Sequence, residues 1–361
     1  MSCTNSGPFR SFGEQMQAVA RSTSRATGGL DVDQRLLQVR APAGGSEQVP
    51  ADGGFLVQPE FATELVTKVY NQGAFLSRAT HFPVTAANGI GVKIPGFDEQ
   101  SRVDGSRWGG VKSYWSNEAD TVTASKPRYR MLEIALKRLY ALSYATDELI
   151  SDTALLGAAL ETAFVNEFKF KAEYGAFFGS GSGQMLGMLN SGNNALITVA
   201  KQTGQQSGSI VALNIQNMYA SMWPPSRSRA CWFVHGDVEQ LLPGLTLVVG
   251  DAGSQIPLFQ FTHDPDNQPY NLLYGRPVIP MEAMPAVGTL GDIVFCDPSQ
   301  YLFADKDGIA GTVSMHIRFL TDEGTFRFVW RIDGMPMWHT TVTPFAGTAV
   351  TSPYVALAAR P

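Results

Sequence analysis

The spacing of apolar residues predicts one long helix in the middle of the chain. From Ser151 to Phe178 such residues recur at steps of three, four or seven positions, which places them on one helical face. They are Leu156, Leu160, Phe164, Phe168, Gly175 and Phe178. At 1.5 Å per residue the segment forms a rod of about 42 Å, long enough to act as a spine for the fold.

Alternation of polar and apolar positions predicts strands on both sides of a long polar stretch. The strands are "VKIPGF" at 92–97 and "YRMLEIALKRLYALSYAT" at 129–146. The stretch between them has few aliphatic side chains but contains Trp108, Tyr114 and Trp115. Because a connection of about thirty residues is unusual inside a compact domain, we predict a two-stranded excursion that projects from the body, with a disordered surface loop as the alternative.

The N-terminal part predicts two helices separated by a loose arm. A short amphipathic helix is expected at 11–21, and a docked helix of about three turns at 59–73. Residues 22–54 are rich in Gly, Ala, Ser and Pro and have few large apolar groups to bury. We therefore expect an extended arm that becomes ordered by docking on another surface.

The second half of the chain changes from mixed helix and strand to mostly strand. Residues 195–290 predict an α/β region, and residues after 290 predict strands with hairpin turns at "DKDG" (305–308) and "TDEG" (321–324). Within the α/β region we expect a helix at 214–223, a buried strand at 230–236, a short helix at 237–242 and a turn into a strand at 274–280.

The distribution of charge is uneven along the chain. Lys and Arg number 27 against 32 Asp and Glu, a net charge of -5, which does not suit a protein that coats nucleic acid by bulk attraction. Residues 93–138 nevertheless carry nine basic and six acidic groups, and residues 1–40 carry five Arg and three acids. The remainder holds thirteen basic against twenty-three acidic groups, so a basic central segment belongs to an acidic body.

Compartment signals are few. Cys3, Cys231 and Cys296 lie far apart and are odd in number, which argues against a disulfide framework and against zinc-ligand spacing. We expect synthesis in a reducing compartment. The N-terminus lacks the apolar core of a signal peptide, and no stretch reaches about 18 apolar residues, so neither secretion by a signal peptide nor a membrane span is expected.

The glycine cluster "GSGSGQ" at 179–184 is the one sequence that resembles a phosphate-binding loop. A Walker loop needs a preceding strand and a Lys followed by Ser or Thr, but here a predicted helix precedes the glycines, Gln184 follows them and the next lysine is Lys201. We interpret the cluster as a helix C-cap and a tight turn that requires positive φ, and we expect no ligand there.

Other candidate chemistry is weak. "HGD" at 235–237 has no second metal-binding motif, and Cys231 and Cys296 lie in apolar strand contexts, where an inert buried thiol is the usual state. The carboxylates of "DKDG" and "TDEG" fit hairpin tips. We therefore expect no catalytic, cofactor or metal site, and we expect that the protein is not an enzyme.

The order of features resembles the major capsid protein family of tailed phages, which has the Hong Kong 97-type fold. The resemblance covers about residues 50–345 and rests on "DGGFLVQPEF", "FFGSGSGQMLGMLN", "LYGRPVIPMEAMP", and the final block from "GDIVFCDPSQYLFADKDGI" to "GTFRFVWRIDG". It implies an α+β fold with an N-terminal arm, an extended β-hairpin loop, a peripheral domain with a long spine helix, and an α/β axial domain.

The resemblance also implies domain bounds. We expect the arm at 1–54, the extended loop at 84–130, the spine at about 147–178, the axial domain at 193–290 and a C-terminal tail near it at 346–361. The peripheral domain is expected at 55–83, 131–192 and 291–345.

In the family the extended loop lies over the adjacent subunit, which implies a set of contact residues here. A basic, aromatic loop over an acidic neighbour gains charge complementarity and buried area. The expected inter-subunit contacts are Arg102, Arg107, Trp108, Lys112, Trp115, Asp322 and Glu323.

Two departures from the family pattern bear on assembly. Only about fifty residues precede "GGFLVQP", so we expect no large built-in scaffold but a separate scaffolding protein or a short functional arm. No asparagine follows Asn271, so the Lys–Asn isopeptide bond that locks some family shells is not expected.

The resemblance leads to a functional hypothesis with two alternatives. The hypothesis is a phage or prophage major capsid protein that forms pentamers and hexamers of an icosahedral shell. It is made in the bacterial cytoplasm and encloses double-stranded DNA without reading its sequence. Its expected partners are copies of itself and scaffolding, portal and decoration proteins, with no cofactor and no membrane. The alternatives are an encapsulin-like compartment and a soluble α/β enzyme or ligand-binding protein.

Overall fold

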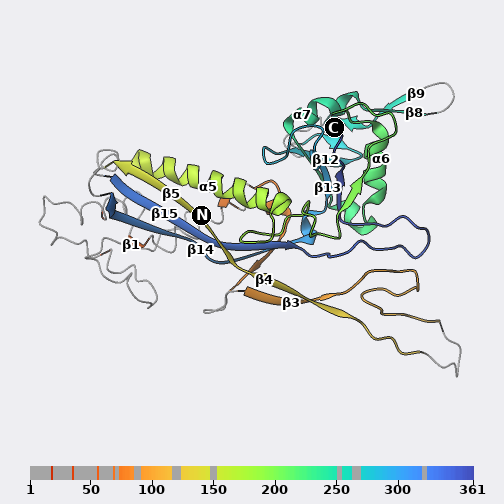
Figure 1. The fold of residues 1–361 in the computed structure, drawn as a ribbon, viewed down its shortest axis with the longest axis horizontal. Coiled ribbons are helices and arrows are strands. Elements are labelled where there is room, and N and C mark those ends of the chain that lie inside the picture. The colour runs from red at the N-terminus through yellow and green to blue at the C-terminus, as the bar shows by residue number, and fades with distance from the viewer. Residues whose placement is uncertain are drawn as a thin grey trace, which may run out of the picture.

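The computed structural model shows a mixed α+β protein with an elongated body, a lobe at one end and a long projecting hairpin (Figure 1). It describes Ala18, Arg35 and residues 55–56, 68–69, 73–84, 91–115, 123–146, 153–249, 254–261, 270–318 and 323–361. The predicted arm, the helices at 11–21 and 59–73 and the start of the spine at 147–152 lie largely outside these residues. Ala18 and Val69 are described, and both are helical and buried.

The body is a long antiparallel sheet covered on one face by a helix. Strands β14 (Tyr301–Arg318), β15 (Glu323–Pro336) and β5 (Lys137–Thr146) pair in that order. At the other edge β1 (Phe55–Leu56) and β2 (Thr80–Pro83) pair with β14. Helix α5 (Thr153–Phe178) runs along the sheet for 26 residues, about 39 Å. The long predicted helix is thus confirmed over this range.

Alternation along β15 explains how the sheet holds the helix. Phe326, Phe328, Trp330 and Ile332 are buried, because every second residue of a strand faces the same side. The ring of Phe164 lies 4.3 Å from that of Phe328, and the ring of Phe168 lies 6.2 Å from that of Trp330. The helical period of α5 and the strand period of β15 therefore meet in one core.

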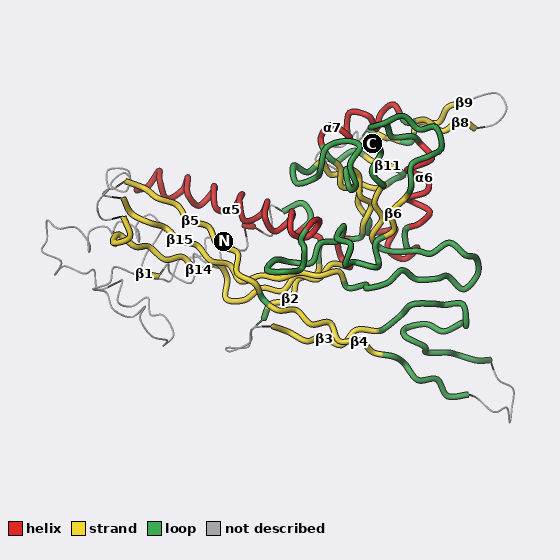
Figure 2. The backbone as a smooth tube through the Cα atoms, viewed as in Figure 1, coloured by secondary structure: helices red, strands yellow, loops and turns green. Residues whose placement is uncertain are grey.

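The lobe contains a seven-stranded sheet in the order β10-β11-β12-β7-β13-β16-β6, flanked by α6 (Ala212–Ser221) and α7 (Gly236–Leu241) (Figure 2). All residues of three consecutive inner strands, β7, β13 and β16, are buried, as in a sheet covered on both faces. The strands are β6 (Ile197–Val199), β7 (Cys231–Val234), β10 (Phe259–Gln260), β11 (Leu272–Leu273), β12 (Arg276–Pro280), β13 (Ile293–Cys296) and β16 (Tyr354–Leu357). A separate hairpin of β8 (Thr246–Val249) and β9 (Ser254–Pro257) projects from the lobe.

An aromatic cluster joins the body to the lobe. The ring of Phe75 lies 5.0 Å from Phe177 of α5, 5.6 Å from Phe233 of β7 and 5.7 Å from Tyr301 of β14. Phe75 sits just before the 3-10 turn η3 (Leu76–Arg78), and its backbone N–H donates to Glu173 Oε1 at 2.8 Å. The pKa of Glu173 lies above its usual value because burial, the largest influence, raises it. Hydrogen bonds from nearby backbone N–H groups oppose this increase in part.

Two predictions in this region need correction. "DKDG" is not a hairpin turn: it lies inside β14, where a bulge between Lys306 and Ile309 absorbs the extra residues. Asp305 is buried and its Oδ1 lies 2.5 Å from His81 Nε2, so a side-chain hydrogen bond replaces the solvent expected at a turn. The expected boundary at residue 290 falls before β13, yet β13 pairs with β7 and β16 inside the lobe, as suits its fully apolar sequence.

The other local predictions are confirmed where the structure describes them. These are the strands at 92–97 and 129–146, the helices at 214–223 and 237–242, and the strands at 230–236 and 274–280. For "TDEG", residues 319–322 lie outside the described range, and β14 and β15 pair antiparallel on either side with Arg318 opposite Glu323. No helix within the described part of the chain is long and apolar enough to cross a membrane.

Candidate functional site

The excursion, defined as residues 91–135, is a two-stranded hairpin that leaves the body at the junction of β4 and β5. Strand β3 (Gly91–Phe97) pairs antiparallel with β4 (Tyr129–Ala135), from Gly91 opposite Ala135 to Phe97 opposite Tyr129. Its base is attached by Ile134, which packs in one cluster with Leu302 and Ala304 of β14. Toward the far end the hairpin leaves the body, as Figure 1 shows. The prediction of a projecting two-stranded excursion is confirmed, and the disordered-loop alternative does not hold for 91–115 and 123–135.

Beyond β3 the chain forms a tight turn that holds a tryptophan in an uncommon conformation. Arg107 and Val111 form an antiparallel bridge, with the Val111 N–H donating to the Arg107 carbonyl at 2.7 Å. Trp108 has φ 51°, a left-handed backbone conformation that is costly for a bulky residue. A Cβ on the following Gly109 would lie 2.5 Å from the Arg128 carbonyl, so glycine is required there.

Exposed aromatic side chains cover one side of this turn. The Trp108 ring lies 5.7 Å from the Phe97 ring, which in turn lies 5.4 Å from the Tyr129 ring. Trp108 is 58% exposed and Tyr129 is 65% exposed, while Trp115 is fully exposed. Three contiguous aromatic rings that are exposed to water are unusual on the surface of a monomer.

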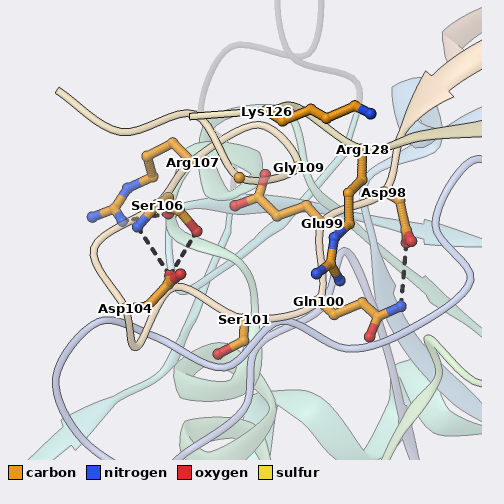
Figure 3. Close-up of a pocket in the computed structure, with 11 residues that line it drawn as sticks. Asp98, Glu99, Gln100, Ser101, Asp104, Ser106, Arg107, Gly109, Lys126 and Arg128 are labelled. Carbon is orange, nitrogen blue, oxygen red and sulfur yellow. Dashed lines mark hydrogen bonds between the residues drawn. The ribbon is translucent and has the colours of Figure 1, made fainter. Parts of the chain in front are cut away.

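The same part of the excursion encloses a polar cavity of about 320 Å³ (Figure 3). Its walls carry both signs of charge, with Asp98, Glu99 and Asp104 among the acids and Arg107, Lys126 and Arg128 among the bases. No group of three metal-binding side chains suited to an ion occurs among the residues that the structure describes. The lining is therefore polar and charged, and it differs from that of a site for an apolar ligand.

Asp104 organises this loop. Its carboxylate accepts hydrogen bonds from the Ser106 hydroxyl at 2.6 Å and the Ser106 N–H at 3.1 Å, and the Lys112 ammonium lies 3.1 Å away. These contacts lower the pKa of Asp104 from 3.8 to about 2, with the Ser106 bonds as the largest cause. The carboxylate stays charged throughout the physiological range and keeps the turn closed.

The predicted contact residues of the excursion divide into two groups. Lys112 pairs with Asp104, the Arg102 guanidinium pairs with Glu99 and lies 5.7 Å from the Trp223 ring, and Arg107 lies 6.0 Å from the Phe345 ring. These three cations are thus engaged within the subunit. Trp108 and Trp115 are exposed as predicted, and Phe97 and Tyr129, which the sequence reasoning missed, are exposed as well.

Of the remaining two predicted contacts, the structure describes only Glu323. Asp322 is outside the described residues, and Glu323 begins β15 opposite Thr146. The excursion leaves the other end of the same sheet, where Ile332 pairs with Lys137. The structure therefore does not bring Glu323 together with the five excursion residues within one subunit.

The glycine cluster after α5 is a turn, as predicted. Gly181 and Gly183 have φ 79° and 69°, and a Cβ on Gly179 would lie 2.2 Å from the Met185 carbonyl. The Lys137 ammonium donates to the Gly181 carbonyl at 3.1 Å and to the Gln184 carbonyl at 2.5 Å. Carbonyl oxygens that face a cation are the reverse of a phosphate cradle, in which N–H groups face an anion.

The weak chemical candidates have structural roles. His235 is the N-cap of α7 and accepts a hydrogen bond from the Asp237 N–H at 3.2 Å. Cys231 and Cys296 are buried, and burial raises the pKa of the Cys231 thiol to about 11, which leaves it protonated and unreactive at neutral pH. Both fit the interpretation made from the sequence.

Solved structures of phage capsids share this fold. The capsid of a native GTA particle, computed with C5 symmetry, has a TM-score of 0.55 at 18% identity and covers 81% of this chain and 91% of its own. The structure named for Microbacterium phage Oxtober96 has a TM-score of 0.52 at 13% identity and covers 91% and 99%. That for Mycobacterium phage Bobi has a TM-score of 0.51 at 12% identity and covers 79% and 90%. The fold is thus that of phage capsid proteins.

The family is defined by sequence as well. The model of the phage capsid family matches residues 53–340, so this chain belongs to the phage capsid family. No curated protein matches the chain. This membership confirms the resemblance to a phage capsid family that the sequence indicated.

Proposed function

We propose that this chain is the major capsid protein of a tailed double-stranded DNA phage or prophage, and that its subunits assemble into pentamers and hexamers of an icosahedral shell around the genome. The observation that carries this proposal is the family match over 53–340 together with a projecting excursion whose aromatic side chains are exposed. A capsid subunit needs an exposed apolar surface because that surface is buried when the next subunit binds to it.

In this proposal the parts of the molecule take the roles of a Hong Kong 97-type subunit. The body with α5 is the peripheral domain with its spine helix, the lobe is the axial domain near the symmetry axis, and the excursion lies over the adjacent subunit. Trp108 and Trp115 form the apolar contact, since large aromatic anchors dominate such interfaces. The intramolecular partners of Arg102, Arg107 and Lys112 hold the loop in shape, and Asp322 and Glu323 contact a different neighbour at the far end of the sheet.

The acidic body supports enclosure of DNA without tight binding to it. The chain outside residues 1–40 and 93–138 has an excess of ten acidic groups, which disfavours adhesion to packaged phosphate. Scaffolding, portal and decoration proteins are proposed as further partners. The shell is proposed to be held without isopeptide bonds, so denaturing electrophoresis of mature particles should show single subunits and no ladder.

Electron microscopy of the purified protein tests the proposal. We expect closed shells, and a persistent small monomer under all assembly conditions would contradict the assignment. Nucleic acid extracted from native particles then separates a phage shell from an encapsulin-like compartment, which would hold a cargo protein instead.

A further inference from the structure

A short segment that follows β15 lies between the excursion and the lobe. Residues 337–345, called the strut below, lie in the blue loop between these two parts in Figure 1. Ser101 and Thr343 form a parallel bridge. The Arg102 N–H donates to the Thr343 carbonyl at 2.9 Å, and the Thr343 N–H donates to the Gln100 carbonyl at 3.2 Å. The excursion is thus joined to the strut by backbone pairing.

Side chains from both strands of the excursion add to this contact. The Arg130 guanidinium of β4 donates to the Met337 carbonyl at 2.9 Å. Asp98, directly after β3, lies 3.3 Å from His339 Nε2. The strut therefore contacts both sides of the hairpin.

The strut is joined to the lobe on its other side. Val342 and Thr351 form an antiparallel bridge with both backbone hydrogen bonds at 2.9 Å. Ser352 in turn accepts from the Trp223 N–H at 3.0 Å and donates to the Ser221 carbonyl at 3.1 Å, at the end of α6. Backbone hydrogen bonds therefore link the excursion, the strut and the lobe in one series.

Three side chains reinforce the point where these parts meet. The Trp338 ring of the strut lies 4.8 Å from the Trp223 ring of the lobe, and the Arg102 guanidinium of the excursion lies 5.7 Å from that same Trp223 ring. The Trp338 indole N–H also donates to Gln300 Oε1 at 3.0 Å, beside the start of β14. The contact thus reaches excursion, strut, lobe and body.

We propose that residues 337–345 fix the angle between the excursion and the lobe within each subunit, with Arg130 and Arg102 as the positioning residues on the excursion. A two-stranded hairpin is only marginally stable alone, and in the described part of the chain β3 and β4 form a sheet of two strands. A strut that holds it in place before the neighbour binds removes part of the ordering cost of association.

Hydrogen exchange of the unassembled subunit tests this without reference to assembly. Arg130→Met keeps the aliphatic stem of the side chain but loses the donor to Met337. Arg128→Met removes the same charge two residues away and is the matched control. Loss of a hydrogen bond from a charged donor corresponds to about a tenfold change. We expect amides of 98–105 and 340–345 to exchange about tenfold faster in Arg130→Met and at the parent rate in Arg128→Met. Equal exchange in both variants would overturn the proposal.

A disulfide gives a second test that does not depend on Arg130→Met folding. Adjacent strands lie about 4.8 Å apart, within the Cα separations that disulfides span. Ser101→Cys with Thr343→Cys, in a Cys3→Ser background, should form an intramolecular bond on oxidation. A folded variant that forms no such bond would refute the juxtaposition.

The assembly part of this test rests on the proposed function. We expect the oxidised variant to form shells as the parent does, because the strut contact is retained in the particle. If only the reduced form assembled, the excursion would have to leave the strut and the proposal would fail. If the parent itself formed no shells, the proposed function would fail while the exchange result stood.

Discussion

Trp330 of β15 and Trp108 of the excursion both belong to aromatic clusters in β-structure, yet Trp330 is fully buried and Trp108 is 58% exposed. Trp330 faces Phe168 of α5, so the subunit itself supplies its covering layer. Trp108 contacts Phe97, and neither ring is covered by a helix or a second sheet. The subunit therefore buries the tryptophan ring of the body and leaves that of the excursion exposed.

This difference shows that the subunit is folded by one set of apolar residues and exposes another set at its surface. The body and lobe have continuous cores that the chain completes alone. The excursion instead keeps its shape by polar contacts, namely Asp104 with Ser106, Arg130 with the Met337 carbonyl, and the bridge between Ser101 and Thr343. Its apolar surface remains free to contribute to association.

The largest expected effect comes from deletion of residues 98–118. This deletion should abolish shell formation, because it removes both exposed tryptophans of the excursion, Trp108 and Trp115. The core between α5 and the sheet contains none of these residues, so the variant should stay folded. Circular dichroism would measure folding and electron microscopy would count shells. Normal shells from this variant would refute the role given to the excursion.

The opposite behaviour is expected for Trp330→Ala. Truncation of a buried tryptophan leaves a cavity and should lower the free energy of unfolding by about 3–5 kcal/mol. Chemical denaturation of the unassembled subunit measures this loss. Trp330→Phe is the control and should lose less. If Trp330→Ala unfolded at the parent denaturant concentration, the α5 core would not be the main source of stability.

Much of the fold was predictable because its periods are strong. The helical repeat of α5 and the alternation in β3, β4 and β5 appear directly in the sequence, and the inner strands of the lobe are continuous apolar runs. Two misses have physical causes. The bulge in β14 lets "DKDG" remain in a strand, and His81, distant in sequence, is the partner that makes buried Asp305 tolerable.

The candidate site was less predictable because its contacts are long-range. Composition favoured Arg102, Arg107 and Lys112 as outward groups, but Trp223, Phe345 and Asp104 engage them within the chain. The strut has no period to detect, since it pairs through single backbone bridges. Its two large aromatic residues, Trp338 and Phe345, stand apart in a polar sequence and form no motif. The Trp-Gly-Gly sequence at 108–110, by contrast, does signal a tight turn.

Trp108→Ala should affect assembly more than folding. The ring is 58% exposed and its aromatic contact is the exposed ring of Phe97, so the loss of folding stability should be within about 1 kcal/mol. A central aromatic anchor contributes about 2 kcal/mol or more to association, so the protein concentration needed for shells should rise at least about tenfold. Trp108→Gly relaxes the positive φ and should assemble just as poorly. Light scattering measures assembly, and equal losses of folding and assembly would show that Trp108 is a core residue.

The smallest expected effect is a pH dependence of the strut. Burial and the nearby charge of Arg130 lower the pKa of His339 below its usual 6.5, although Asp98 opposes them. A histidine whose folded pKa is depressed adds stability while it is neutral, so this contribution is complete above pH 6.5 and is lost as the pH falls through the folded pKa. Asp333 and Glu173 have raised pKa values, which act in the opposite direction on acidification.

The comparison must therefore be between the parent and His339→Gln. Amides of 98–105 should exchange faster at pH 5.5 than at pH 7.5 in the parent, after correction for intrinsic rates, and the change should be smaller in His339→Gln. An identical pH response in both proteins would show that His339 does not contribute to holding the excursion.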